Sequence, residues 1–376
     1  MCIRPISNQT LNNINEFKYK YKNDSILYNK IMSPCLDKVV NCIPKNIAPN
    51  LLTFLSLICN AIGFIISFQD GGFDFSKKLK PRTCYIVGFS QLLYQLLDNI
   101  DGKQAKRTGN STPFGILMDH GCDIFINIFT SFNMSKLLIV GNHGFYSFSI
   151  FFGLFVGFHM MTYEDYKLGE IHFPSFNAVD EGNFSVFLLG ILCGIYGQNW
   201  LQNYINVYFF KIKLTYSNAF SLVIFFGGII LWFNLYYHTL KKKGCLENFK
   251  TFFDNITFYI CIFVPYFYIY KKKIFYQLSK WILILNTSLI FARVTLDMQI
   301  KIATMDIFKC NIMFVFSNLI FIISIIIDVY IINYYWLIIL AMLQGVELVF
   351  FIFLRAKQIT EFLDVEIFDV EKHELN

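Results

Sequence analysis

The sequence predicts an all-α polytopic membrane protein with about ten transmembrane helices. Of its 376 residues, 55% are hydrophobic and only 15% are charged, whereas soluble proteins carry close to a quarter charged residues. Apolar stretches long enough to cross a bilayer recur along the chain. The net charge of +6 is small and scattered, which argues against a nucleic-acid partner. The ten Cys residues lack paired spacing, so neither a disulfide framework nor a zinc cluster is predicted.

The N-terminal segment, residues 1–46, is predicted to be cytosolic. It is polar and rich in Lys, and it shows no apolar stretch followed by a cleavage site, so we do not expect a signal peptide. Residues 26–40 carry apolar groups at helical spacing, interrupted by Pro34. This pattern predicts an amphipathic helix that lies on the membrane surface before the first span.

The transmembrane helices follow one another with short connections that leave no room for a soluble domain. A span needs about 20 apolar residues, because a rise of 1.5 Å per residue must cover about 30 Å of hydrocarbon. The predicted spans are 50–68, 83–100, 115–139, 145–165, 184–201, 217–238, 251–270, 276–298, 308–331 and 334–355.

The distribution of Lys and Arg predicts the orientation of these spans. With ten spans, both termini share a side with every second loop, and this side carries most of the 32 basic residues, so we expect it to be cytosolic. The chain then divides into the helices of residues 47–200, which hold the charged cluster described next, additional helices at 201–356, and a cytosolic tail at 357–376.

One dense cluster of charge breaks the apolar pattern. From Asp98 to Asp123 the chain holds four acidic residues, three basic residues and a His. Asp98 and Asp101 are three residues apart at the end of the second span, and Asp119 and Asp123 are four apart at the start of the third. Each pair therefore shares a helix face, and the short connection predicts that the helices are antiparallel neighbours whose carboxylates meet.

Four carboxylates at the end of two membrane helices require cations. Crowded carboxylates in a low dielectric repel one another, and oxygen ligands favour Mg²⁺ or Mn²⁺. Asp98, Asp101, Asp119 and Asp123 are thus candidate ligands of two metal ions that clamp a phosphate ester. Between the pairs, the small residues leave room for a ligand near the backbone and the basic ones supply charge for phosphate oxygens; these are Gly102, Ala105, Gly115, Lys103, Lys106 and Arg107.

This spacing resembles the signature of the CDP-alcohol phosphatidyltransferase class-I family. Eight positions are in register, with a Lys where the family usually carries Arg: Asp98, Asp101, Gly102, Ala105, Lys106, Gly115, Asp119 and Asp123. Ile-Ala-Pro-Asn-Leu-Leu-Thr at 47–53 and Asp-His-Gly-Cys-Asp at 119–123 are most similar to the eukaryotic choline and ethanolamine phosphotransferases. The resemblance makes 47–200 the catalytic helices, with Asn50, Gly102, Ala105, Lys106 and Gly115 as candidate donor-binding residues. Asn50 is equally an ordinary residue for a helix start after Pro49.

The resemblance implies transfer of phosphocholine or phosphoethanolamine from CDP-choline or CDP-ethanolamine to diacylglycerol, with release of CMP. It also implies the endoplasmic reticulum membrane, an active site facing the cytosol and a homodimer. Two residues compete for the general base. Asp123 is the traditional proposal, whereas an imidazole such as His120 titrates closer to neutral pH. We favour His120 if Asp123 binds metal, and by resemblance we expect Glu181 to orient it.

Two alternatives remain. Another CDP-alcohol phosphotransferase, with inositol, serine or glycerol phosphate as substrate, is typically shorter, with about six spans. A cation transporter also uses intramembrane carboxylates, but it does not need the Gly, Ala and basic pattern between them. Two further charges lie in predicted spans: Arg293 either contacts phosphate or extends to the interface, and Glu347 is expected to have a buried polar partner. Gly227 and Gly228 are predicted helix-packing sites.

Overall fold

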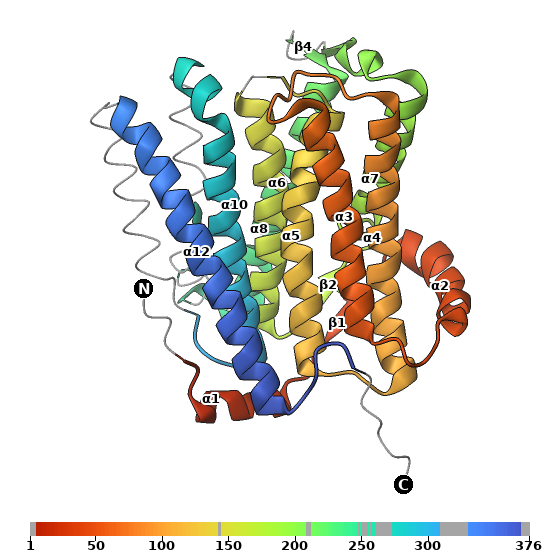
Figure 1. The fold of residues 1–376 in the computed structure, drawn as a ribbon, viewed down its shortest axis with the longest axis vertical. Coiled ribbons are helices and arrows are strands. Elements are labelled where there is room, and N and C mark those ends of the chain that lie inside the picture. Colours follow the sequence, from red (N-terminus) through yellow and green to blue (C-terminus); the bar gives the residue numbers. More distant parts are fainter. Residues whose placement is uncertain are drawn as a thin grey trace.

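The computed structural model is a bundle of long helices, which confirms the predicted all-α membrane class (Figure 1). The structure describes residues 5–141, 144–207, 212–246, 249, 255, 258–259, 273–308 and 330–369. Five described helices, α3, α6, α8, α10 and α12, are long and apolar enough to cross a membrane.

Eight of the ten predicted spans coincide with long helices. The predictions at 251–270 and 308–331 lie almost entirely outside the described residues. The helices are α3 (Pro49–Gly71), α4 (Pro81–Thr108), α5 (Pro113–Leu137), α6 (Gly144–Leu168), α7 (Asp180–Tyr196), α8 (Tyr216–Lys243), α10 (Lys273–Ala303) and α12 (Tyr330–Leu363). Three of them begin with Pro at the first turn, where the missing N–H costs no hydrogen bond.

In the N-terminal segment, α1 lies below the bundle and α2 lies beside the lower part of α4 (Figure 1). It contains α1 (Asn8–Asn12), η1 (Asn13–Glu16), β1 (Tyr21–Asn23), η2 (Tyr28–Met32), α2 (Ser33–Val39) and η3 (Val40–Cys42). The turns from 28 to 42 form the predicted amphipathic helix. Met32, Leu36 and Val40, at a spacing of four, pack against Leu52 of α3 and Ile100 of α4. Pro34 lies in the first turn of α2 and so does not interrupt it.

Two short sheets were not predicted. β1 pairs in parallel with β2 (Ile171–Phe173), so that Tyr21 lies opposite Ile171 and Lys22 opposite His172. β3 (Tyr204–Val207) and β4 (Ile212–Thr215) form an antiparallel hairpin at the other end of the bundle. Strands of three or four residues are too short for their alternation to stand out in sequence.

A buried polar network ties together the helices around the candidate site. Gln91 of α4 accepts hydrogen bonds from Asn60 of α3 and Thr130 of α5, at 2.8 and 3.0 Å, and donates one to Asn183 of α7. α3 packs along both α4 and α5, whereas α4 and α5 touch each other over only a short length. The two carboxylate-bearing helices are therefore antiparallel, as predicted, but α3 lies between them over most of their length.

Arg293 of α10 and Glu347 of α12 form a buried ion pair. The Arg293 Nε lies 3.0 Å from Glu347 Oε1, and both side chains are buried. The guanidinium also lies over the Phe351 ring. Glu347 thus has the buried polar partner that we expected, while Arg293 does not extend to the interface.

The glycines of α8 provide a test of helix packing. A Cβ on Gly228 would lie 2.8 Å from the Cα of Gly153 on α6, whereas one on Gly227 would meet no atom within 4 Å. Of the two predicted packing sites, Gly228 is confirmed and Gly227 is wrong.

We predict that Gly228→Ala lowers the thermal stability of the detergent-purified protein. Overpacking against α6 should reduce the free energy of unfolding by about 1–3 kcal/mol. The matched control, Gly227→Ala, should be neutral or stabilising, because Ala is better than Gly in a helix by about 1 kcal/mol. Equal melting temperatures for the two variants would contradict this packing.

Candidate active site

The signature segment forms the end of α4, a tight turn and the start of α5. Gly109 ends α4 with a positive φ of 72°, which a residue without Cβ adopts readily. The Thr112 side chain then caps α5 by accepting a hydrogen bond from the Gly115 N–H at 3.0 Å. This turn sets the last turns of α4 beside the first turns of α5, which is where the acidic residues lie.

Three of the four predicted metal ligands converge. Carboxylate oxygens of Asp98, Asp119 and Asp123 all lie within 4.8 Å of one another. Asp101 is buried, and its Oδ2 accepts a short hydrogen bond from the Thr53 hydroxyl of α3. Among the described residues, no Lys, Arg or His forms an ion pair with any of the four.

The unpartnered oxygens of this cluster fit a metal site. Asp98 Oδ1 and Asp119 Oδ1 are buried, yet neither has a hydrogen-bond partner in the described part of the chain. A buried acceptor without a partner costs about 1–3 kcal/mol, and more if it is charged. An all-oxygen donor set of carboxylates suits Mg²⁺ or Mn²⁺, so these residues have the chemistry to hold such ions.

His120 lies among the carboxylates and has an orienting partner. Its Nδ1 is 3.2 Å from Gln299 Oε1 of α10, while Gln299 Nε2 donates to the Thr162 hydroxyl of α6. Because the Gln299 oxygen can only accept, Nδ1 carries the proton and Nε2 keeps its lone pair. The Tyr19 ring of the N-terminal segment contacts the His120 ring edge-on at 5.0 Å between centroids.

Tyr19 and Tyr94 frame the cluster with phenol groups. The Tyr94 hydroxyl donates to Asp123 Oδ1 at 2.9 Å, so that one oxygen of Asp123 is hydrogen-bonded within the protein. Burial, assisted by the neighbouring acidic residues Asp165 and Asp119, raises the pKa of Tyr19 well above its usual value. Tyr19 therefore stays a neutral phenol at physiological pH.

Glu181 does not orient His120, which corrects our expectation. Its Oε1 accepts hydrogen bonds from the Ser25 hydroxyl at 2.8 Å and the Leu27 N–H at 3.1 Å, and its Oε2 accepts one from the Asn177 N–H. Burial raises the pKa of Glu181, but these three donors outweigh it and leave a net lowering. At the first turn of α7, Glu181 instead anchors the segment that follows β1.

The three basic residues of the signature have different surroundings. Lys103 pairs with Asp37 at 2.7 Å, and Arg107 donates to the carbonyls of Val40 and Ile43, so both tether the amphipathic helix. Among the described contacts Lys106 forms no ion pair, and its ammonium lies 5.9 Å from the Tyr21 ring centroid. Lys106 is the basic residue that remains for a ligand.

Gly102, Ala105, Gly115 and Asn50 surround the turn. A Cβ on Gly102 would meet no atom within 4 Å, so there is open space beside this glycine, and Ala105 is only partly buried. A Cβ on Gly115 would lie 3.2 Å from Asn50 Oδ1, which explains the small residue. The Asn50 amide donates to the Ile367 carbonyl of the C-terminal segment at 2.8 Å.

Sequence reasoning missed several residues of this site: Tyr19, Tyr94, Thr162 and Gln299. For Gln299, the sequence does offer a signal: a polar amide near the end of an apolar span is expected to face the interior of the bundle. The two tyrosines could not be told apart from the other twenty.

Residues 46–173 match the CDP-alcohol phosphatidyltransferase family. This chain therefore carries a CDP-alcohol phosphatidyltransferase domain, which confirms the resemblance of its signature. The match contains the whole carboxylate cluster, His120, and the helices α3 to α6 that hold it.

Curated relatives support the same family. An uncharacterized CDP-alcohol phosphatidyltransferase class-I family protein 3 of Dictyostelium discoideum is 33% identical over 51% of this chain and 48% of its own length. Cholinephosphotransferase 1 of Saccharomyces cerevisiae is 30% identical over 51% of this chain and 48% of its own. Cholinephosphotransferase 1 of Homo sapiens is 27% identical over 66% and 59%. The matched part thus spans about half the length of these relatives.

We predict that Mn²⁺ or Mg²⁺ stabilises the protein through this cluster. An ion that binds the folded state at a hundred times its Kd adds about 2.7 kcal/mol. The shift in melting temperature should disappear in Asp98→Asn and Asp119→Asn, which each change an oxygen without a partner. Glu361→Gln, at an exposed carboxylate of α12, is the control and should retain the shift. A shift that survives in both Asp variants would refute the metal site.

Proposed function

We propose that the protein transfers phosphocholine or phosphoethanolamine from a CDP-alcohol to diacylglycerol, forming phosphatidylcholine or phosphatidylethanolamine and releasing CMP. The observation that carries the proposal is the convergence of Asp98, Asp119 and Asp123, with unpartnered oxygens, beside an oriented His120. We also propose the endoplasmic reticulum membrane as its location, with the site facing the cytosol. The homodimer that the resemblance implies stays a prediction.

In this proposal the carboxylates bind the CDP-alcohol donor indirectly, through divalent ions. Asp98, Asp101, Asp119 and Asp123 are the proposed ligands of two divalent ions, Mg²⁺ or Mn²⁺. When bound, these ions neutralise pyrophosphate charge and stabilise the oxygens that attack and leave. Lys106 adds a positive charge at the same end of α4, and the space beside Gly102 admits a ligand close to the backbone.

His120 is the proposed general base. The hydroxyl oxygen of diacylglycerol attacks the β-phosphorus, its proton passes to His120 Nε2, and the bond from phosphorus to the CMP oxygen breaks. Gln299 holds the tautomer that leaves Nε2 free. Asp123 is the competing candidate, but its Oδ1 already accepts from Tyr94 and its carboxylate belongs to the metal cluster.

Glu181 has a positioning role in this proposal. It accepts hydrogen bonds from Ser25 and Leu27, which follow β1 in the chain. Tyr21 of β1 stacks on Tyr19, and the Tyr19 ring contacts His120. The buried pair of Arg293 and Glu347 stabilises the packing of α10, on which Gln299 lies.

The decisive experiment supplies the purified protein with labelled CDP-choline or CDP-ethanolamine, diacylglycerol and Mg²⁺ or Mn²⁺. We expect a labelled phospholipid and CMP in equal amounts. Parallel reactions with CDP-diacylglycerol and inositol, serine or glycerol phosphate test the related reactions of the family. Product only in those reactions would replace the proposed substrates, and product in none would overturn the function.

Two variants test the roles of individual residues. Asp119→Asn should abolish turnover, because a ligand of the donor's counter-ions is lost.

His120→Ala should lower kcat by about 10²–10⁴-fold, the usual contribution of a general base, while CDP-alcohol still binds with its original Kd. Loss of CDP-alcohol binding in His120→Ala would refute its role as the base, and a melting temperature close to that of the unchanged protein excludes misfolding.

A further inference from the structure

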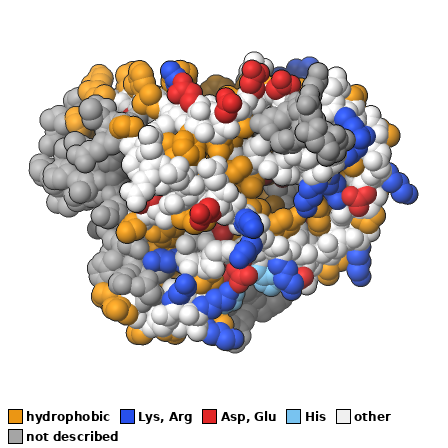
Figure 2. All heavy atoms as spheres, turned by 90° about the horizontal axis from the view of Figure 1, so that it is seen from below, with side chains coloured by type: hydrophobic (Ala, Val, Ile, Leu, Met, Phe, Trp, Pro, Cys, Tyr) orange, Lys and Arg blue, Asp and Glu red, His pale blue; other side chains and the backbone are white. Residues whose placement is uncertain are grey.

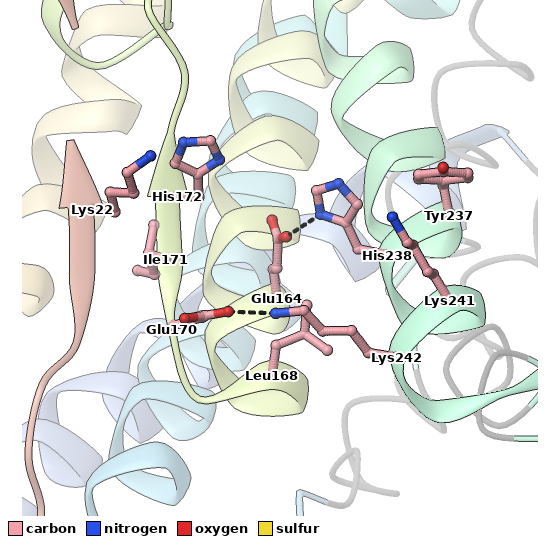
Figure 3. A pocket seen from close by; sticks show the side chains of 10 residues that line it. All are labelled: Lys22, Glu164, Leu168, Glu170, Ile171, His172, Tyr237, His238, Lys241 and Lys242. Atoms are coloured by element: carbon pink, nitrogen blue, oxygen red, sulfur yellow. Dashed lines mark hydrogen bonds and ion pairs between the residues drawn. The ribbon is translucent and has the colours of Figure 1, made fainter. Parts of the chain in front are cut away.

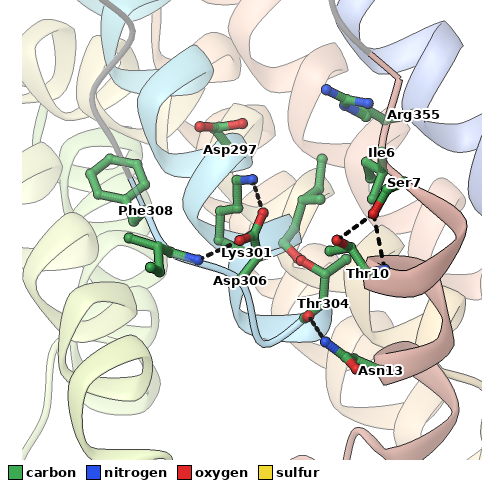
Figure 4. A network of polar contacts seen from close by, with 12 residues as sticks. Ile6, Ser7, Thr10, Asn13, Asp297, Lys301, Thr304, Asp306, Phe308 and Arg355 are labelled. Atoms are coloured by element: carbon green, nitrogen blue, oxygen red, sulfur yellow. Dashed lines mark hydrogen bonds and ion pairs between the residues drawn. The ribbon is translucent and has the colours of Figure 1, made fainter.

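A polar pocket lies between the ends of α6 and α8 and the β1–β2 ribbon, apart from the carboxylate cluster. Its cavity is about 510 Å³, and its lining combines three Lys and two His with two Glu: Lys22, Glu164, Leu168, Glu170, Ile171, His172, Tyr237, His238, Lys241 and Lys242. In Figure 3 Lys22 and His172 stand on one side of the pocket, with His238 and Lys241 on the other. None of these residues belongs to the carboxylate cluster.

The acidic residues of the pocket are already paired. Glu164 Oε1 lies 2.7 Å from His238 Nδ1, and Glu170 pairs with Lys242. On the opposite wall, Lys22 and His172 share Asp24. Within the described contacts Lys241 has no acidic partner, although its side chain faces the same space. Lys22 and Lys242 already have acidic partners, so Lys241 is the lysine of the lining that, within the described contacts, can pair with an anion.

The position of the pocket along α8 identifies the kind of anion. One face of α8 exposes an apolar stripe at steps of three and four residues, made by Phe220, Val223, Phe226, Ile230, Phe233, Tyr237 and Leu240. The helix rises about 30 Å from Phe220 to Leu240, which is the thickness of the bilayer hydrocarbon. Of the five candidate spans in the described chain, α8 is the least buried.

The stripe and the pocket meet at one level. Tyr237 belongs to both, and Lys241 to Lys243 follow directly in the last turn of α8. Acyl chains that lie along the stripe would place a headgroup at the pocket. Basic side chains near the membrane surface attract anionic lipid headgroups, and Figure 2 shows Lys and Arg, with Asp and Glu among them, on this end of the molecule.

We propose that this pocket binds the phosphate of an anionic phospholipid whose acyl chains lie along α8. The headgroup phosphate contacts Lys241 from α8, and Lys22 from β1 lines the opposite wall. The proposal concerns binding and does not depend on the proposed function.

The test compares two neighbouring lysines in the full-length protein. Lys241→Gln and Lys243→Gln each remove one charge from the last turn of α8, but only Lys241 lines the pocket. Binding of phosphatidylserine and of phosphatidylcholine with the same acyl chains is measured by native mass spectrometry in detergent. Inorganic phosphate is tested as a competitor.

We expect the unchanged protein to bind phosphatidylserine in preference to phosphatidylcholine. Lys241→Gln should weaken this binding about fivefold, the contribution of one Lys near the membrane, and Lys243→Gln should leave it within about twofold. Equal losses in the two variants would indicate diffuse surface attraction and overturn the site. Equal binding of both lipids, or displacement by inorganic phosphate at the lipid's own concentration, would overturn the assignment to an anionic lipid.

Discussion

Mutual repulsion among buried carboxylates is the constraint on which this structure depends. Carboxylate oxygens of Asp98, Asp119 and Asp123 lie within 4.8 Å of one another, and if two of these groups are ionised they repel by about 3 kcal/mol at an effective dielectric constant of 20. No described cationic side chain offsets this repulsion. The bundle must therefore hold the helices together by other contacts, such as the amide and hydroxyl network around Gln91, and leave the carboxylates to an added cation.

Segments from both ends of the chain close around the same cluster. The N-terminal segment brings Tyr19 against His120, and Lys103 and Arg107 tether the amphipathic helix to α4. After α12, the carbonyls of Ile367 and Asp369 accept hydrogen bonds from Asn50 and Asn110 at the two sides of the signature turn. Val365 and Ile367 pack with Phe114 at the start of α5. The signature segment is thus recognised by local spacing, but its surroundings come from distant parts of the chain, including C-terminal residues more than 250 positions away.

The sequence was sufficient for those features that depend on local periodicity. Span lengths follow from apolar runs, and the i, i+3 and i, i+4 spacings placed Asp98, Asp119 and Asp123 on facing surfaces, so this part of the site could be predicted. The partners of His120, Glu181 and Arg293 could not. Most of these partners lie in segments far apart in the chain, and no spacing rule relates Gln299 to His120, Glu347 to Arg293 or Ser25 to Glu181. The role of Gly228 against Gly227 likewise depends on which face of α8 meets α6.

Buried charged residues of this molecule fall into two groups, those with a partner in the protein and those whose oxygens have none among the described residues. Arg293 and Glu347 are buried and pair with each other, and Arg293 also lies 3.6 Å from Asp297, so these charges are balanced within the protein. Removing Arg293 would leave the buried Glu347 without this partner. Asp101 is held by Thr53, and Lys103 by Asp37, so these residues have protein partners even within the signature. In the part of the chain that the structure describes, Asp98 and Asp119 instead each keep a buried oxygen without a donor. Since such atoms cost free energy in the folded state, a ligand that satisfies them is the simplest reason for their presence beside an oriented imidazole. The proposed reaction site at the junction of α4 and α5 rests on this observation.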